Sequence, residues 1–178
     1  KKILNRSGAE MFRLWVASED YRNDIRISEE ILKRLGEGYR RIRNTCRFLL
    51  GNLSDFDPKK DMVAYKEREE ADRWVLSRLE GLIEKVSRAY EGYEFHKVYH
   101  ALLGFASNDL SSLYLDVAKD RLYCEGTASA TRRATQSTIY EIAKAVALLS
   151  APILTFTAED IWKHIPKHPL DDHSLRND

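Results

Sequence analysis

Residues 28–53 read SEEILKRLGEGYRRIRNTCRFLLGNL, a pattern typical of one long amphipathic helix. Ser28 is a favourable N-cap, and the two glutamates after it suit the positive end of the helix dipole. Gly36 and Gly38 either permit a close helix crossing or mark a bend. The apolar residues recur at steps of three and four: Ile31, Leu35, Tyr39, Ile42, Cys46, Leu49 and Leu53. We therefore expect this helix to pack one face against a core.

A row of arginines lies beside that apolar stripe. Arg40, Arg43 and Arg47 fall about one turn apart, with Asn44 next to them. A guanidinium group is permanently charged, and its planar set of N–H donors matches the oxygens of a phosphate. Most charged rows on helices are solvated faces, however, and acidic residues are placed to pair with part of this one: Glu29, Glu30 and Glu37. The row alone leaves both interpretations open.

Other segments with helical periodicity predict further helices. We expect a short helix at 8–17, long helices at 67–90 and 95–123, a helix that ends before Pro152, and a last one that carries Trp162. The apolar stripe of the 95–123 helix comprises Val98, Leu102, Ala106, Leu110, Leu113 and Val117. No segment alternates apolar and polar residues with a period of two. The sequence therefore predicts an all-α bundle of antiparallel helices, with the tryptophans in its core.

The composition is that of a single soluble domain. With 178 residues, of which 43% are hydrophobic, the chain is long enough to bury one sizeable core. Its formal net charge of +1 means that any nucleic-acid surface must be a local patch. No apolar run approaches the roughly 20 residues that cross a bilayer, and the first residues lack the apolar segment of a signal peptide. We expect a cytoplasmic protein with no membrane partner, and a piece of a longer chain.

Recognisable catalytic motifs are missing from the sequence. His96 and His100 lie one helical turn apart, which can present two imidazoles to a metal, but no cysteine pair or carboxylate cluster completes a ligand set. There is no glycine-rich phosphate loop and no nucleophile elbow. Cys46 and Cys124 are far apart and are expected to be reduced. We therefore expect a chain that holds no metal or cofactor and is not catalytic by itself.

A second candidate region lies at the end of the 95–123 segment, in SLYLDVAKDRLYCEG. Arg121 and Tyr123 come just before a loop, where they can hydrogen-bond or stack on unpaired RNA bases. Arg132 and Arg133 follow that loop and add positive charge to the same end. The competing interpretation is a helix end in which Arg121 pairs with a neighbouring aspartate. The pattern does not decide between the two.

Five blocks of the sequence are far longer than any short motif. They are GAEMFRLWVASEDYRNDIRIS, YRRIRNTCRFLLGNL, YEFHKVYH, DLSSLYLDVAKDRLY and APILTFTAEDIW, in this order between residues 8 and 162. Together they closely resemble the region downstream of the catalytic domain in the isoleucyl-tRNA synthetases, a class Ia aminoacyl-tRNA synthetase family. The first two blocks favour this family over its valyl and leucyl relatives.

The resemblance implies an anticodon-binding helical bundle. Residues 1–27 would be a connector after the catalytic core with one short helix, 28–165 the bundle, and 166–178 an irregular C-terminal tail. In that family the whole enzyme uses ATP and magnesium to ligate isoleucine to its tRNA, and bacterial members usually hold zinc in a C-terminal region. No segment of this chain resembles these catalytic or metal-binding parts. The implied partner is isoleucine tRNA rather than DNA, and the fragment is expected to be monomeric.

The resemblance also points to particular side chains. The YRRIRN block resembles the helix that faces the anticodon, and the residues it implies for tRNA binding are Arg40, Arg43, Asn44, Arg47 and, less directly, Tyr39, Arg121 and Tyr123. The glycines Gly36 and Gly38 are unusual for that helix. Two rivals from other classes stay open: a helical module whose arginines meet acidic groups on a protein partner, and a hydrolase with the histidine pair as its metal site.

Overall fold

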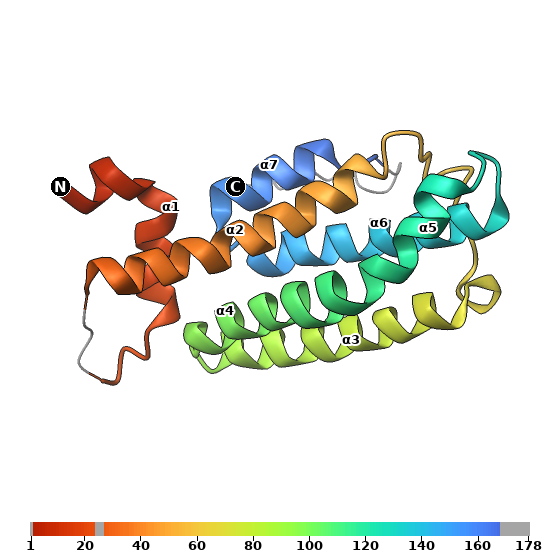
Figure 1. The fold of residues 1–178 in the computed structure, drawn as a ribbon. Coiled ribbons are helices and arrows are strands. Elements are labelled where there is room, and N and C mark those ends of the chain that lie inside the picture. Colours follow the sequence, from red (N-terminus) through yellow and green to blue (C-terminus); the bar gives the residue numbers. More distant parts are fainter. Residues whose placement is uncertain (1, 24–26, 168–178) are drawn as a thin grey trace.

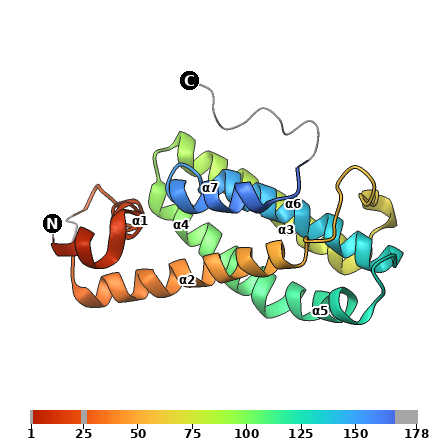
Figure 2. The ribbon, with the colours of Figure 1, turned by 90° about the horizontal axis from the view of Figure 1, so that it is seen from above.

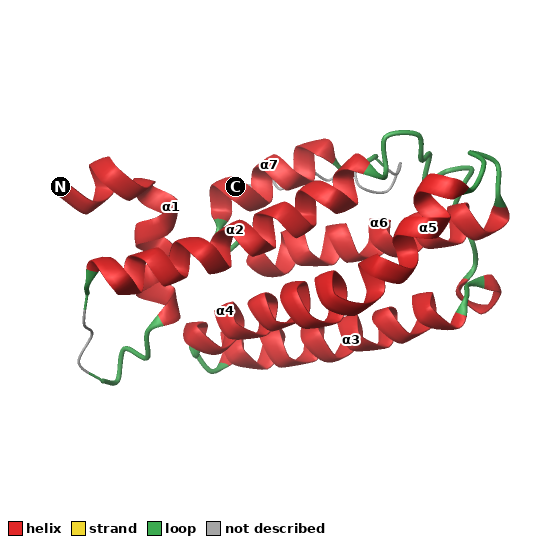
Figure 3. Ribbon diagram, in the orientation of Figure 1, coloured by secondary structure: helices red, strands yellow, loops and turns green. Residues whose placement is uncertain are grey.

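The computed structural model describes residues 2–23 and 27–167, and within these ranges the regular elements are all helical (Figure 1, Figure 3). In chain order the elements are α1 (Lys2–Ser18), α2 (Glu29–Gly51), the 3₁₀ turn η1 (Tyr65–Glu67), α3 (Glu70–Glu91), α4 (Phe95–Gly104), the π-helical segment η2 (Phe105–Tyr114), α5 (Leu115–Cys124), α6 (Ala130–Ser150) and α7 (Thr155–His164). The predicted all-α bundle is confirmed.

The central helix begins where its N-cap predicts. The Ser28 hydroxyl accepts a hydrogen bond from the Ile31 backbone N–H at 3.2 Å, and α2 then continues for 23 residues. The predicted stripe is buried along its middle, at Leu35, Ile42, Cys46 and Leu49. Viewed from above, α2 runs along one side of the bundle and extends past it toward α1 (Figure 2). One face of α2 thus belongs to the core.

Gly38 permits a close helix crossing. It is buried, and a methyl group built on its Cα would overlap the Tyr99 hydroxyl of α4 and come within 3.2 Å of a Leu103 methyl group. The same group built on Gly36 would meet only the end of Met11, at 3.9 Å. The dihedral angles of α2 stay helical at both glycines. Of the two interpretations left open for Gly38, the structure supports the crossing.

The core lies between α3, α4, α6 and the inner face of α2. Helices α3 and α4 run antiparallel side by side, and α6 packs on α3 and on α7 (Figure 1). The completely buried residues of this core include Val75, Val86, Ile139 and Ile142. These contacts come from the predicted apolar stripes of residues 67–90 and of the helix before Pro152.

Residues 95–123 form one continuous helical path, but its middle differs from the prediction. Residues Phe105–Tyr114 form a π-helix, in which backbone hydrogen bonds join residues five positions apart instead of four. Each turn therefore contains more residues than a turn of the α-helix. The apolar stripe therefore changes phase. Leu113 and Val117, predicted as core, are 55% and 49% exposed, whereas Leu115, Ala118 and Leu122 are buried. Trp74 on α3 is also 39% exposed, so its assignment to the core was wrong.

The first helix has two parts. Its dihedral angles leave the helical region at Gly8, with φ of 79°, a left-handed value that favours a residue without a side chain. The part after the break, up to Ser18, corresponds to the predicted 8–17 helix. Arg13 joins it to the start of α7, because its guanidinium donates to the carbonyls of Pro152 and Ile153 at 2.9 and 3.1 Å.

Candidate nucleic-acid interface

The arginine row of α2 is exposed to solvent. Because the α-helix repeats every 3.6 residues, positions 40, 43, 44 and 47 share the face opposite the buried stripe. Arg40, Arg43 and Arg47 are all exposed, and among the described residues none of them forms an ion pair. Arg40 is held against its own helix, since its Nε donates to the Gly36 carbonyl at 3.2 Å. The predicted pairing with Glu37 is not observed.

A groove lies at the C-terminal end of this row. It encloses about 420 Å³, and residues from both predicted regions line it, with Asn44 and Arg47 from α2 and Tyr123 from α5. The Tyr123 side chain is 64% exposed, and its ring meets the Phe48 ring edge-on with centroids 6.4 Å apart. An exposed aromatic ring beside a free guanidinium is the combination on which unpaired bases stack. We call this the Arg47–Tyr123 groove.

Arg121 lies inside the bundle and not in this groove. Its Nη1 donates to Asp72 Oδ2 at 3.2 Å, and only 20% of its side chain is exposed. The Tyr114 hydroxyl donates to the other oxygen of Asp72 at 2.5 Å. Asp72 is completely buried, and this burial raises its pKa although both partners oppose the shift. The partner of Arg121 is thus an aspartate of α3, not one of its own helix as the competing interpretation had it.

Tyr39 also faces away from the arginine row. Its side chain packs against the hydrophobic core, and its hydroxyl lies 2.8 Å from the Thr157 hydroxyl of α7. The Thr157 hydroxyl in turn donates to Glu10 of α1 at 2.7 Å. Tyr39 therefore links three helices, and the structure does not bring it together with Asn44 and Arg47.

The second pair of arginines is held by the segment that precedes η1. Arg132 donates two hydrogen bonds to the Asp55 carboxylate, at 2.6 and 3.1 Å, and only 12% of its side chain is exposed. Arg133 donates to the Asp55 carbonyl at 2.9 Å and to Gln136 at 2.7 Å. The positive charge that these arginines were expected to add to the loop end is thus offset, because Asp55, distant in the sequence, pairs with both of them.

The histidine pair does not gather a ligand set. His96 is half-buried and His100 is exposed, and the described residues hold no group of three or more His, Cys, Asp or Glu side chains placed for a metal ion. The thiols of Cys46 and Cys124 are free, and burial raises the pKa of Cys46 to about 12. None of the described helices is long and apolar enough to span a membrane.

The family model for the anticodon-binding domain of tRNA ligases matches residues 72–176, more than half of the chain. This chain belongs to that family. Among curated relatives, the isoleucine–tRNA ligase of Syntrophotalea carbinolica is 55% identical over 93% of this chain and 18% of its own length. The isoleucine–tRNA ligases of Geobacter sulfurreducens and Desulfitobacterium hafniense are 52% and 49% identical over 94% and 97% of this chain. The chain spans about a fifth of the length of these relatives.

In this anticodon-binding domain the family match begins at Asp72 in α3, so the arginine row precedes the matched residues. These relatives nevertheless align with nearly the whole chain, so the similarity extends into α2. Three residues that line the Arg47–Tyr123 groove were not predicted from the sequence: Phe48, Gly51 and Asn52. Phe48 lies just off the apolar stripe, and an aromatic residue at such a position is the signal that could have indicated it.

Proposed function

We propose that this domain binds the anticodon stem-loop of isoleucine tRNA as part of an ATP-dependent isoleucine–tRNA ligase. The observation that carries the proposal is the exposed row of arginines on α2, which form no ion pair among the described residues and end at the Arg47–Tyr123 groove. The names of the relatives support isoleucine as the amino acid, against the valyl and leucyl alternatives. If the arginine row were only a solvent-exposed charged face, there would be no reason for an aromatic groove at its end.

The residues of the interface divide into two roles. Arg40 and Arg47 bind phosphates of the stem and fix its position, since guanidinium groups recognise phosphate oxygens whatever the base. Arg43 and Asn44 contact base edges, and Tyr123 stacks on an unpaired base, which together supply the preference for one anticodon. Arg121 and Tyr39 act indirectly, through the helices that they hold in place.

The proposal extends to the rest of the ligase. Residues 1–27 connect this domain to the catalytic core, 28–165 form the tRNA-binding bundle, and 166–178, of which 168–178 lie outside the described residues, form a tail. ATP and magnesium are used by parts of the enzyme outside this chain, and zinc is bound by a C-terminal region also outside it. We further propose that the domain is monomeric and works in the cytoplasm.

Binding to anticodon stem-loop RNAs tests the proposal. Fluorescence anisotropy would compare a stem-loop that carries the isoleucine anticodon with stem-loops changed at one anticodon base. We expect Arg40→Ala and Arg47→Ala to weaken binding to all of them by about tenfold. Arg43→Ala and Asn44→Ala should instead reduce the preference for the isoleucine anticodon, since a good base contact contributes about 1–3 kcal/mol of discrimination.

Lys85 is an exposed cation on α3, and Lys85→Ala is the matched control. It should change neither the affinity for the stem-loops nor the preference for the isoleucine anticodon. Equal losses on every RNA from all four variants would contradict the division into phosphate and base contacts. A wild-type domain that binds acidic peptides but shows no affinity for any stem-loop would favour the protein-interaction module instead.

A further inference from the structure

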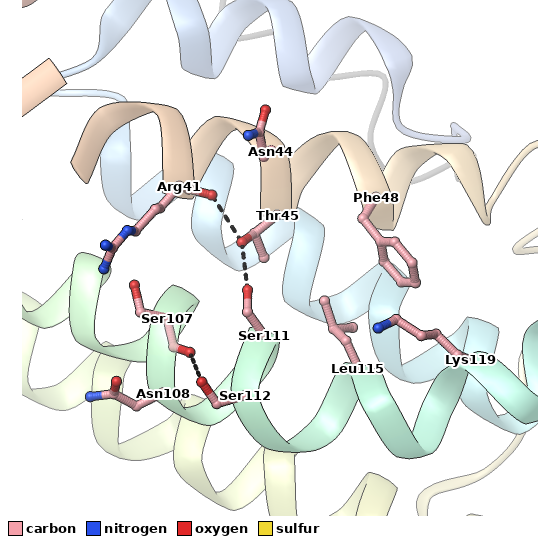
Figure 4. Close-up of a pocket in the computed structure, with 10 residues that line it drawn as sticks. All are labelled: Arg41, Asn44, Thr45, Phe48, Ser107, Asn108, Ser111, Ser112, Leu115 and Lys119. Carbon is pink, nitrogen blue, oxygen red and sulfur yellow. Dashed lines mark hydrogen bonds between the residues drawn. The ribbon is translucent and has the colours of Figure 1, made fainter. Parts of the chain in front are cut away.

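A second groove lies between α2 on one side and the π-helical segment η2 with the start of α5 on the other (Figure 4). It encloses about 530 Å³, within the range of roughly 300–1,000 Å³ that is common for small-molecule sites. Asn44 and Phe48 line both grooves, so the two are continuous along α2. We call this second one the π-segment groove.

The floor of this groove is made of hydroxyl groups that already have partners. The Thr45 hydroxyl lies 3.1 Å from the Ser111 hydroxyl and donates to the Arg41 carbonyl at 3.0 Å. On η2, Ser111 and Ser112 each donate to the carbonyl five residues earlier, at 2.8 Å. These bonds follow the wide turns of the π-helix. They stay within η2, and a polar trough lies between η2 and α2.

The two ends of the groove differ in chemistry. Arg41 reaches from α2 toward η2 at one end, near Ser107, whereas the Phe48 ring points toward Lys119 at the other (Figure 4). Lys119 is held by Asp116 at 2.6 Å, but no residue that lines the groove carries a carboxylate. The groove therefore offers a cation and neutral hydrogen-bonding groups at one end and an aromatic face with a second cation at the other.

The Ser107 hydroxyl is an unpaired polar group in the wall of this groove, as His96 Nδ1 and Thr135 Oγ1 are elsewhere among the described residues. It is buried in the groove wall and has no hydrogen-bond partner among the described residues, although Ser112 uses the Ser107 carbonyl. A buried polar group without a partner destabilises the fold. Alanine at this position would avoid the penalty. A ligand in the groove would supply the partner that the fold does not.

We propose that the π-segment groove holds one unpaired RNA nucleotide, with its base against Phe48 and Leu115 and its ribose and phosphate toward Ser107, Asn108 and Arg41. The chemistry fits ribonucleotides because the 2′-hydroxyl is both donor and acceptor and is the group that distinguishes RNA from DNA. Short π-helical segments also occur often at functional sites. The inference rests on the proposed function, since the nucleotide belongs to the anticodon stem-loop.

The test uses the whole 178-residue domain and an isoleucine anticodon stem-loop with single 2′-deoxy substitutions at each unpaired nucleotide. We expect one loop position at which the 2′-deoxy change weakens binding to the wild-type domain by about fivefold, the effect of losing one hydrogen bond. Ser107→Ala should weaken binding to the unmodified RNA by a similar factor. The same 2′-deoxy change should then have no further effect on the variant.

Two further measurements separate binding from folding. Ser107→Ala should leave the melting temperature unchanged or raise it, because it removes an unpaired buried hydroxyl. Ser77→Ala on α3, an exposed serine far from the groove in sequence, is the matched control and should bind like the wild type.

The proposal is overturned if no 2′-deoxy position weakens binding, or if the losses from Ser107→Ala and from the 2′-deoxy change simply add. In either case a loss of binding in Arg47→Ala would still support the proposed function. Absence of binding by the wild-type domain would overturn both.

Discussion

Arg121 and Tyr123 are two residues apart on α5, yet their side chains meet opposite surroundings. Tyr123 lies in solvent beside Phe48, whereas Arg121 reaches inward to the buried Asp72. A buried carboxylate is tolerated only when it is paired and hydrogen-bonded. We infer that Arg121 acts on the groove indirectly. It holds α5 against α3, and this contact fixes the position of Tyr123 in the groove.

Replacing Arg121 by alanine should destabilise the domain. Asp72 would lose its ion pair and keep only neutral hydrogen-bond partners, the Tyr114 hydroxyl and the Glu69 backbone, so we expect the free energy of unfolding to fall by about 1.5–3 kcal/mol. Urea denaturation measures the change, and Lys119→Ala, at an exposed ion pair of the same helix, should stay within about 0.5 kcal/mol of the wild type. Unchanged stability combined with weaker RNA binding would instead make Arg121 a tRNA contact.

The Asp55 carboxylate should make the free energy of unfolding depend on pH in the acid range. Hydrogen bonds from Arg132 lower its pKa to about 2, against about 3.9 for an aspartate in an unfolded chain. A carboxylate with a lowered folded pKa stabilises the fold above the unfolded pKa, and this contribution disappears as the pH falls from about 4 to about 2. The stability gap between wild type and Asp55→Asn should therefore be largest at neutral pH and shrink across that window. Urea denaturation at several pH values measures this stability difference. A difference that does not change with pH would contradict the prediction.

At the scale of single elements, α2 is shaped by its glycines. Alanine at Gly38 would collide with Tyr99, and overpacking of this kind destabilises by about 1–3 kcal/mol. Alanine at Gly36 meets only ordinary contact and should stabilise by up to about 1 kcal/mol through helix propensity. Thermal unfolding of the two single variants should therefore show a lower melting temperature for Gly38→Ala and a higher one for Gly36→Ala. Two stabilising changes would show that the crossing with α4 is not tight.

The long amphipathic helices could be predicted because a core face repeats every 3.6 residues, and α2 follows this rule from Leu35 to Leu49. Segment η2 could not, since the apolar pattern carries no signal for its wider turns, which the hydroxyls of Ser111 and Ser112 accompany by bonding to carbonyls five residues earlier. Assuming the α-helical period there placed Leu113 and Val117 in the core. The groove beside η2 was missed for the same reason.

The exposed arginines could be located from the sequence, but the paired ones could not be told apart from them. Arg121 pairs with Asp72, 49 residues away, and Arg132 pairs with Asp55, 77 residues away. Only the tertiary fold brings these charges together. In this chain, a run of arginines on the face opposite a core stripe therefore indicated exposed and unpaired charge better than arginines near a loop did.

For the whole molecule, the balance of charge makes the interface local. The net charge is only +1, so general attraction between the domain and a polyanion is weak, and binding depends on the patch formed by α2 and the end of α5. If the domain is part of a ligase, as proposed, further surfaces held by the same chain would add to this one through effective concentration. The isolated domain should accordingly bind RNA with a salt dependence set by a few phosphate contacts.

The salt dependence of stem-loop binding tests the role of the α2 arginine row most directly. The logarithm of the binding constant should fall linearly with the logarithm of the salt concentration, and each phosphate-contacting arginine adds about one to the slope. We expect Arg40→Ala combined with Arg47→Ala to reduce the slope by about two, and Lys66→Ala combined with Lys85→Ala to leave it unchanged. Equal slopes for the wild type and the double arginine variant would contradict the account.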